Sequence, residues 1–399
     1  MSDAVDLPPP AAPIIKVCIE QEILPAWRGA DAIAGRLVDP VGAMTDGRAA
    51  PVASLRVQAQ RIDALATAGL FSNAAADLRR ATALLAAVLD QFLSADGEPG
   101  FPRAIDLEGD VVDPSRDFEA HAWLLRAVAK VHAMTRSSET LLVADLILEF
   151  LDAHLKRGEV GYRPDTSGGQ IAGQRGHLRL LEGLLALHRA TERPCDLARA
   201  QRIVELFRFH LLDRAAGGVP ERFDPDWRAV HVGPTAFFFP RTSAEWVVAL
   251  SRFRRQSGDG RVAADLAVLR RTLLSSRGGD GLIADVVGLD GKPAADGAAL
   301  AAQLAFFGAL HALDGVSEAG ARAALALDAR IAELFLAPAV KGCWIESLDG
   351  EGRSRGEPLR VSTLASLVEI AALERADVGE SHERTVAFAP ALKRGAQAA

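Results

Sequence analysis

The sequence predicts an all-α fold, an (α/α)6 barrel in which two rings of helices form a toroid with short β-hairpins at one mouth. Two observations carry this prediction. Apolar residues recur at helical spacing through most of the 399 residues, and polar, glycine-bounded segments interrupt them about every sixty residues. A unit of two helices and a hairpin cannot bury its apolar stripe alone, so six such units are expected to stack and close a ring.

The helical segments are rich in Ala, Leu, Arg and Val, with apolar residues at positions i, i+3, i+4 and i+7. This spacing predicts amphipathic helices rather than strands, because strands alternate with a period of two. The predicted helices cover residues 17–33, 52–68, 75–93, 118–134, 139–155, 177–190, 197–212, 243–255, 262–274, 298–313, 318–336 and 363–374.

The segments between alternate helices are too polar and too short to be helical, and turn residues flank a few extended ones in each. Their Asp, Glu, Trp and Tyr side chains are expected to surround a pocket at the mouth of the ring. An open helical solenoid is the alternative, which the recurring hairpin makes less favoured. The six segments are 35–42, 97–109, 158–165, 217–227, 278–291 and 341–352.

Composition predicts one large globular domain that needs neither metals nor disulfides to bury its core. The chain is 49% hydrophobic and 24% charged, which is an ordinary globular balance. We expect residues 1–16 to form a flexible lead and residues 17–375 to form the barrel. Residues 376–399 lose apolar periodicity and are expected to be a poorly structured tail. A monomer and a homodimer fit the sequence equally well.

The net charge and the cysteines indicate which partner and which compartment to expect. A net charge of −7 and a pI near 5.8 argue against a nucleic-acid partner, because basic residues are nowhere concentrated. Cys18, Cys195 and Cys343 are widely separated, which fits reduced thiols in the cytosol. No signal peptide opens the chain and no apolar run could span a bilayer. We expect a soluble, cytoplasmic protein with a small-molecule partner and no membrane.

Motifs for cofactors and metals are absent from the sequence. The histidines show no metal-ligand spacing, since no two of them lie one helical turn apart. The sequence also lacks GxGxxG, P-loop and GxSxG motifs, so nucleotide binding and serine hydrolysis have no support. We expect no metal and no cofactor.

Five motifs follow one another along the chain and are informative through their order and spacing. They are RVQAQRIDALA from Arg56, EAHAWLLRA from Glu119, RGHLRLLEG from Arg175, PRTSAEWVVAL from Pro240 and VSTLASLVE from Val361. Together with the opening at residues 27–42, they resemble the N-acylglucosamine 2-epimerase superfamily over nearly the whole chain. That superfamily includes cellobiose 2-epimerase, mannose isomerase and mannose-6-phosphate isomerase-like proteins.

The resemblance implies metal-free proton transfer at C2 of an opened aldose or sugar phosphate, through an enediolate. The family uses two histidines as acid and base, one in each of the last two motifs, and the matching residues here are Thr242 and Ser366. An unassisted hydroxyl is far too weak a base for this step. The active site is therefore expected to be divergent.

A replacement set is predicted from residues that the motifs keep and from Arg179, which stands where the family has a histidine. His177, Glu245 and Arg179 are the catalytic candidates, sharing proton transfer and charge stabilisation. Structural readings stay open: a histidine can donate to a hairpin carbonyl, and a buried Glu245 can be held by an arginine. The candidate substrate-binding residues are Arg56, Gln60, His121, Glu182, Arg241, Trp246 and Gln303.

Two further function classes remain. A non-catalytic descendant would keep the barrel and use its mouth to bind a carbohydrate or regulate a partner. An (α/α)6 glycoside hydrolase or lyase would need two carboxylates about five to ten ångströms apart in one cavity, such as Glu245 with Glu182 or Glu346. The basic residues Arg175, Arg179 and Arg241 favour a phosphorylated or acidic sugar.

Overall fold

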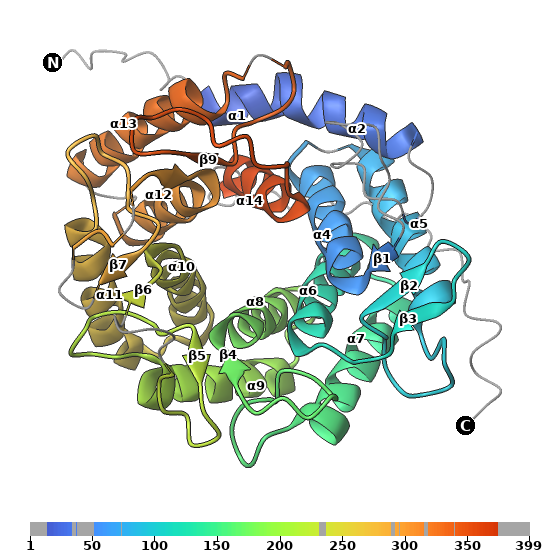
Figure 1. The fold of residues 1–399 in the computed structure, drawn as a ribbon. Helices are drawn as coiled ribbons and strands as arrows, with labels where there is room; N and C mark the ends of the chain where they lie inside the picture. The colour runs from blue at the N-terminus through green and yellow to red at the C-terminus, as the bar shows by residue number, and fades with distance from the viewer. Residues whose placement is uncertain are drawn as a thin grey trace, which may run out of the picture.

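Two concentric rings of helices make up the molecule, as the sequence predicts (Figure 1). The fold is the expected all-α toroid, and its only strands are short ones in the loops of the described part of the chain. The computed structural model describes residues 14–33, 37, 52–72, 74–230, 237–288, 292–294, 296–314, 318–338 and 340–373.

The inner ring consists of helices that contact one another in the order α4, α6, α8, α10, α12, α14 and back to α4. Local signals start several of them: the Asp117 carboxylate accepts from the Ala120 amide at 2.7 Å, and Pro240 occupies the first turn of α10. The bounds are α4 Leu55–Ser72, α6 Phe118–Thr135, α8 Gln174–Thr191, α10 Pro240–Ser257, α12 Leu300–Asp314 and α14 Val361–Ala372.

Each outer helix from residue 75 onward packs on the inner helix that precedes it in the chain, whereas residues 14–23 pack on α14 and on the last outer helix, and the apolar faces of all of them complete the core. Three of them contain a π-helical turn, which widens the helix by one residue per turn. The bounds are α1 Ile14–Cys18, η1 Ile19–Ile23, α2 Leu24–Ile33, α5 Ala75–Phe92, α7 Ser138–Phe150, η2 Leu151–Leu155, α9 Pro194–Leu206, η3 Phe207–Leu211, η4 Gly260–Val262, α11 Ala263–Ser275 and α13 Glu318–Phe335.

Short antiparallel strands join neighbouring loops at the mouth. Four of the five pairs follow one rule. One strand directly precedes an inner helix, and its partner lies in the loop that leads to the next inner helix. The pair β2–β3 is a hairpin within one loop. The Asp117–Asp165 bridge makes the same link between the α6 and α8 loops. The pairs are β1 Val52–Ser54 with β2 Ala104–Asp106, β2 with β3 Val111–Asp113, β4 Ala172–Gly173 with β5 Arg222–Phe223, β6 Phe237–Phe238 with β7 Val287–Gly288, and β8 Ala298–Ala299 with β9 Ser347–Leu348.

Two of the predicted helix starts are strands instead. Residues 52–54 and 298–299 are strands rather than the first turn of an inner helix, because pairing with the next loop satisfies their backbone groups. Of the local hairpins expected within the loops, β2–β3 is a pair of strands, and others in the described residues occur as isolated bridges, such as Lys156–Tyr162 and Arg277–Ile283. Most of the predicted lead and all of the predicted tail lie outside the described residues, so the domain limits of 17 and 375 remain a prediction.

Helices α6 and α8 approach each other closely at a glycine. A Cβ atom on Gly183 would lie 3.1 Å from the Arg126 backbone nitrogen and 3.3 Å from its Cα atom. Near the helix starts, a Cβ on Gly176 would meet the Phe118 ring at 2.5 Å. Glycine at these positions lets the two inner helices pack with little space between their backbones.

We expect Gly183→Leu to lower the free energy of unfolding by roughly 1–3 kcal/mol, because the new side chain has no room between α6 and α8. The matched control is Gly29→Leu in α2, where a Cβ meets nothing within 4 Å. There the better helix propensity should leave stability unchanged or slightly higher. Urea unfolding of both variants measures the difference, and equal stabilities would contradict the close-approach argument.

Candidate functional site

A buried network of charges crosses the ring interior, and Arg126 of α6 lies at its centre. The Arg126 guanidinium contacts carboxylates from three other inner helices. Its Nε lies 3.1 Å from Asp63 of α4, its Nη1 donates to Glu182 of α8 at 2.6 Å, and its Nη2 donates to Glu369 of α14. The Arg126 side chain is only 3% exposed. The cation therefore offsets part of the negative charge of three carboxylates that come from three different helices.

The network continues toward the mouth through Arg179 of α8. Arg179 donates to Glu182 at 2.8 Å and to Glu245 of α10 at 2.6 Å. Glu245 also accepts from Arg241 Nε at 3.0 Å, one helical turn away. Three predicted site residues, Arg179, Glu182 and Glu245, thus meet in the ring interior, and Arg241 joins them from the mouth.

The arginines keep Glu245 ionised. Burial alone would raise the pKa of the Glu245 carboxyl, but Arg179 and Arg241 outweigh it and lower that pKa to about 2. For Arg179, burial disfavours the charge, whereas Glu182 and Glu245 favour it more strongly and raise the guanidinium pKa. Glu245 is therefore a carboxylate at every physiological pH, available as a hydrogen-bond acceptor or a weak base.

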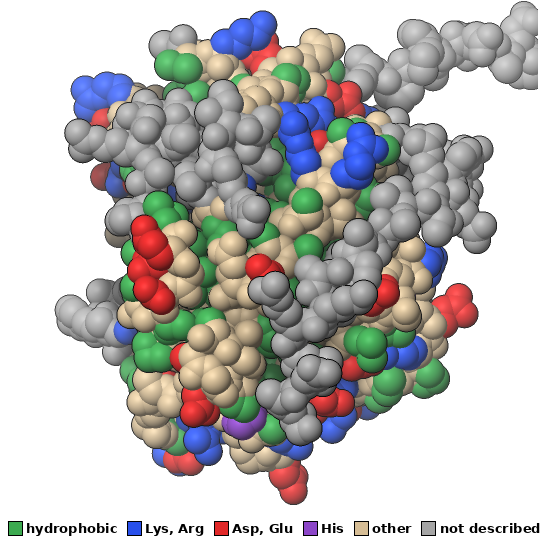
Figure 2. Space-filling view, turned by 90° about the vertical axis from the view of Figure 1, so that its right-hand side faces the viewer, with side chains coloured by type: hydrophobic (Ala, Val, Ile, Leu, Met, Phe, Trp, Pro, Cys, Tyr) green, Lys and Arg blue, Asp and Glu red, His purple; other side chains and the backbone are tan. Residues whose placement is uncertain are grey.

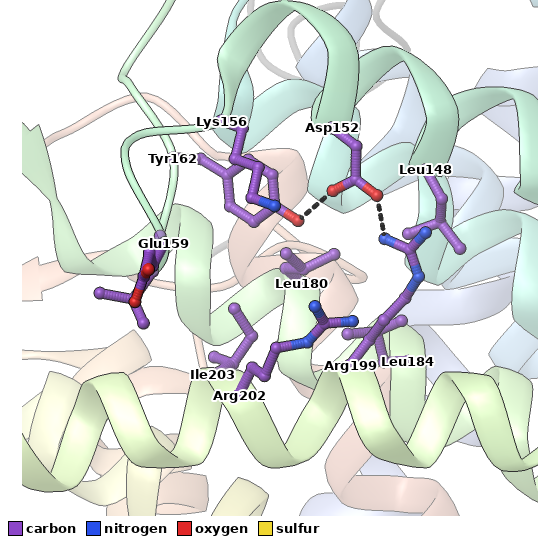
Figure 3. Close-up of a pocket in the computed structure, with 12 residues that line it drawn as sticks. Leu148, Asp152, Lys156, Glu159, Tyr162, Leu180, Leu184, Arg199, Arg202 and Ile203 are labelled. Atoms are coloured by element: carbon purple, nitrogen blue, oxygen red, sulfur yellow. Dashed lines mark hydrogen bonds and ion pairs between the residues drawn. The ribbon is translucent and has the colours of Figure 1, made fainter.

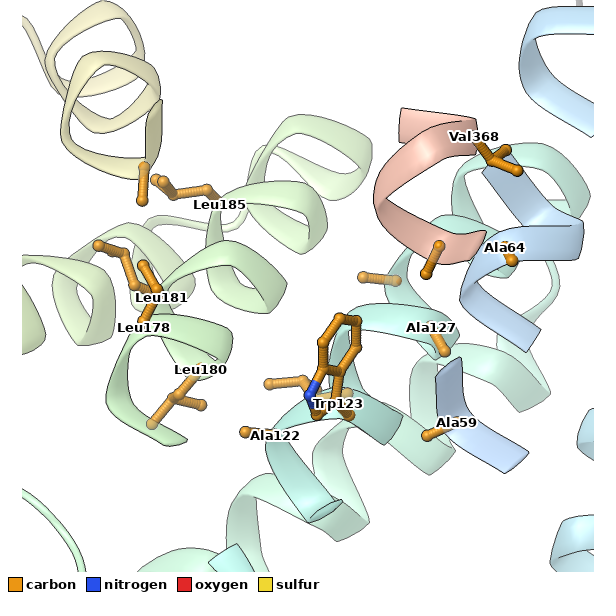
Figure 4. Packing of buried hydrophobic residues seen from close by; sticks show 14 of the residues in the cluster. Ala59, Ala64, Ala122, Trp123, Ala127, Leu178, Leu180, Leu181, Leu185 and Val368 are labelled. Atoms are coloured by element: carbon orange, nitrogen blue, oxygen red, sulfur yellow. The ribbon is translucent and has the colours of Figure 1, made fainter. Parts of the chain in front are cut away.

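Trp123 of α6 provides an aromatic surface beside this network. Its indole lies in the space between α6, α8 and α14 (Figure 4), with the Arg179 guanidinium 4.7 Å and the Arg126 guanidinium 4.9 Å from the ring centroid. The Trp123 Nε1 and Arg179 Nε atoms are buried and have no hydrogen-bond partner among the described residues. Buried donors usually find an acceptor, so a ligand oxygen is a chemically suitable partner for both.

His121 and His177 tie the mouth loops to the inner helices. Nε2 of His177 accepts from the Tyr162 amide at 3.0 Å, and Nδ1 lies 3.1 Å from the Gly173 carbonyl oxygen. In His121 the same atoms bond the Phe101 amide at 3.2 Å and the Asp117 carbonyl at 2.7 Å. Both rings are fully buried, and burial lowers the pKa of each to about 4. This geometry supports the structural reading of both residues and gives no support to proton transfer by His177.

Glutamines hold equivalent loops in two other units. Gln303 of α12 accepts from the Ile283 amide and donates to the Ile283 carbonyl, both at 2.9 Å. Gln58 of α4 donates to the Leu37 carbonyl at 3.0 Å. Gln303 is fully buried by this role, so the structure does not place it for substrate contact.

The remaining predicted binding residues differ in how deeply their side chains are buried. Trp246 is fully buried, donates from Nε1 to Gln174 at 2.8 Å and packs on Phe207, so it serves the core rather than an exposed platform. Gln60 is buried in α4 at 7% exposure. Arg56 is half exposed at the mouth and lies 3.9 Å from Glu119.

The two altered family positions carry no base. The Thr242 hydroxyl is buried and donates to Glu221 at 2.8 Å. Ser366 donates to the Ser362 carbonyl at 3.0 Å, one turn back in α14. Glu346, proposed as a partner carboxylate for Glu245, instead accepts from Trp344, Thr363 and the Arg360 amide at the start of α14.

Asp63, Trp123, Arg126 and Glu369 are site residues that sequence reasoning missed. A usable signal was present, because each charged member stands alone in an apolar helical run, and such residues are almost always paired when buried. Their partners could not be named from the sequence, since each pair joins helices far apart in the chain.

Metal-binding clusters and membrane-spanning helices are both absent from the described residues. These residues contain no group of three or more His, Cys, Asp or Glu side chains arranged to hold a metal ion. Within the same residues, every helix is too short or too polar to cross a bilayer. On the face shown in Figure 2, acidic and basic side chains are interspersed among apolar ones.

The family model of N-acylglucosamine 2-epimerase matches residues 45–361, which is most of the chain. The chain belongs to the N-acylglucosamine 2-epimerase family. The family predicted from the five motifs is thereby confirmed. None of the curated proteins matches this sequence at a significant level.

Solved structures similar to this member of the N-acylglucosamine 2-epimerase family have the same fold at low identity. Cellobiose 2-epimerase from Bacillus thermoamylovorans B4167 is 15% identical with a TM-score of 0.76, covering 90% of this chain and 98% of its own. A D-mannose isomerase is 16% identical with a TM-score of 0.77, covering 90% and 97%. The α-1,6-mannanase GH76A of Salegentibacter sp. HEL1_6 is 14% identical at 0.64, covering 90% and 98%.

Because His121 and His177 hold mouth loops through neutral, buried rings, we predict that the fold loses stability in acid. Histidine has a pKa near 6.5 in the unfolded chain, whereas burial lowers the pKa of these two rings to about 4 in the folded protein. Between these two values the unfolded chain binds more protons than the folded one. The free energy of unfolding therefore falls as the pH falls. We expect a loss of up to about 2 kcal/mol per histidine between about pH 7 and 5.

In the double variant His121→Gln, His177→Gln, each new glutamine can hold its loop as Gln303 does. The variant should lose the part of the pH dependence of stability that comes from the two histidines, while its loops stay attached. Urea unfolding at the two pH values measures it. The exposed His210→Gln is the control and should keep the wild-type slope. A double variant with an unchanged slope would show that other groups cause the acid sensitivity.

Proposed function

We propose that this protein is a sugar epimerase or isomerase that acts on an aldose or a sugar phosphate in the ring interior, by proton transfer at C2 through an enediolate. The observation that carries the proposal is the meeting of Glu245, Arg179 and Trp123 in the centre of a ring of this family. Mannose and its phosphate are the first substrates to test. A cytoplasmic location and a monomer or homodimer are part of the same proposal.

The roles follow from charge. Arg179 and Arg241 are the cations closest to the space beside Glu245, so they are suited to hold the negative oxygens of an enediolate. Glu245 is the ionised group that would accept the C2 proton, as carboxylates do in other enzymes that enolise sugars. Trp123 would support a sugar face, and its free Nε1 would donate to a hydroxyl.

A specific observation favours a second candidate, a non-catalytic sugar-binding protein. With a pKa of about 2, Glu245 is a weaker base than the general bases poised near neutrality that proton transfer favours, and Thr242 and Ser366 replace the two histidines. The glycoside hydrolase reading gains no such support. Its acid needs a raised pKa, whereas that of Glu245 is lowered and Arg179 bonds both Glu182 and Glu245.

Proton exchange in deuterated water tests the proposal directly. We expect protein-dependent loss of the C2 proton signal in NMR spectra of mannose, glucose, N-acetylmannosamine or mannose 6-phosphate, or loss of a C1 proton signal in spectra of the ketoses fructose and fructose 6-phosphate. Glu245→Gln should slow the exchange at least about hundredfold, because the base is lost. Glu333→Gln, at an exposed pair on the outer helix α13, is the control and should keep the full rate.

A Glu245→Gln variant that still binds sugar but exchanges no proton would assign the base. If the folded wild type exchanges no proton with any of these sugars yet binds one of them, the non-catalytic candidate replaces the enzyme.

The pH profile of the exchange should be flat between about pH 5 and 8. Glu245 is ionised and both buried histidines are neutral throughout this range, so no group proposed for the reaction titrates there. Initial rates of C2 exchange, measured in buffers of constant ionic strength, check this. An inflection near pH 6.5 would indicate an exposed histidine as the base.

A further inference from the structure

A hollow on the outer wall of the barrel lies apart from the charge network of the interior. Helices α7 and α9, the π turn η2 and the loop after it surround the hollow, and α8 forms its floor (Figure 3). Leu148, Leu180, Leu184 and Ile203 give it an apolar base. The hollow therefore has a closed inner end and an opening to solvent, which suits a small ligand better than a flat protein surface.

Three cations and two carboxylates, Asp152 and Glu159, line the polar side of this hollow. Lys156 follows η2, and Arg199 and Arg202 lie on consecutive turns of α9. Asp152 accepts from Arg199 at 2.6 Å and from the Tyr162 hydroxyl at 2.9 Å. Burial and Asp152 together raise the pKa of the Tyr162 hydroxyl, so it stays protonated and able to donate.

Lys156 and Arg202 differ from the cations of the ring interior. Arg126, Arg179 and Arg241 each have a carboxylate partner within 3.1 Å. No ion pair with another described residue is found for Lys156 or Arg202, and both are exposed at the hollow (Figure 3). An anion that enters here meets two positive charges without first displacing a carboxylate.

We propose that this outer hollow binds a small phosphate monoester, with Lys156 and Arg202 holding the phosphate oxygens. The Asp152 carboxylate and the Tyr162 hydroxyl are placed to exchange hydrogen bonds with hydroxyl groups of the same ligand. The apolar base made by Leu180, Leu184 and Ile203 accommodates its carbon chain. Arginine and lysine are the side chains that bind phosphate in proteins, the first by its planar fork and the second as a point charge.

The hollow is connected to the interior through α8. Leu180 and Leu184 face the hollow, whereas Arg179 and Glu182 of the same helix belong to the charge network. Tyr162 lines the hollow with its ring and donates its amide to His177 of α8. A ligand in the hollow therefore contacts the helix that carries Arg179, although it touches none of the residues proposed for proton transfer.

Isothermal titration of the full-length protein with inorganic phosphate and with glycerol 3-phosphate tests the site. We expect saturable binding, tighter for glycerol 3-phosphate, that weakens at least about tenfold in the Lys156→Gln, Arg202→Gln double variant. The charge-matched control is Arg228→Gln with Arg353→Gln, at exposed arginines of two mouth loops. This control should bind as the wild type does.

Three results would overturn the proposal: no saturable binding, equal weakening in both double variants, or loss of binding only in Arg241→Gln, which reports on the ring interior. Because the titration needs no turnover, its outcome is independent of C2 exchange. Circular dichroism and thermal unfolding without ligand confirm that each variant is folded before it is titrated.

Discussion

One buried guanidinium, that of Arg126, determines how charge is arranged inside the inner ring. It lies against carboxylates from α4, α8 and α14, so four of the six inner helices meet at a single cation. Three carboxylates around one cation leave an excess of negative charge, which further cations must balance. Those cations are Lys130 beside Asp63, Arg179 beside Glu182 and Arg252 beside Glu369.

The same arrangement limits the chemistry of the centre. Arginines hold Glu245 and Glu369, and they lower the pKa of both carboxyls although burial alone would raise it. Positive charge, in contrast, is abundant next to Trp123. The interior is therefore better suited to stabilise an anionic intermediate than to remove a proton. The first property favours a sugar epimerase or isomerase, and the second favours a non-catalytic sugar-binding protein.

The sequence predicted the ring and its helices, because apolar spacing and glycine-bounded loops are local properties. It misassigned residues 52–54 and 298–299, whose apolar pattern continues that of the helix although they pair with a distant loop. For the site, it predicted Arg179 and Glu245 through motif positions. It could not predict that both nitrogens of His177 bond to backbone groups, nor that Arg126 joins three helices, since such contacts depend on the closed ring.

The strand pairs at the mouth have a consequence for how this surface can change. Among the described residues, backbone pairing joins each mouth loop to the next from the loop before α4 to the loop before α14, so these loops are not independent of one another. An insertion in one loop would shift the backbone pairing of its neighbour as well. A change of ligand specificity in this fold should therefore involve two adjacent loops together with the strand that joins them. The same unit should be transferred when loops are grafted by design.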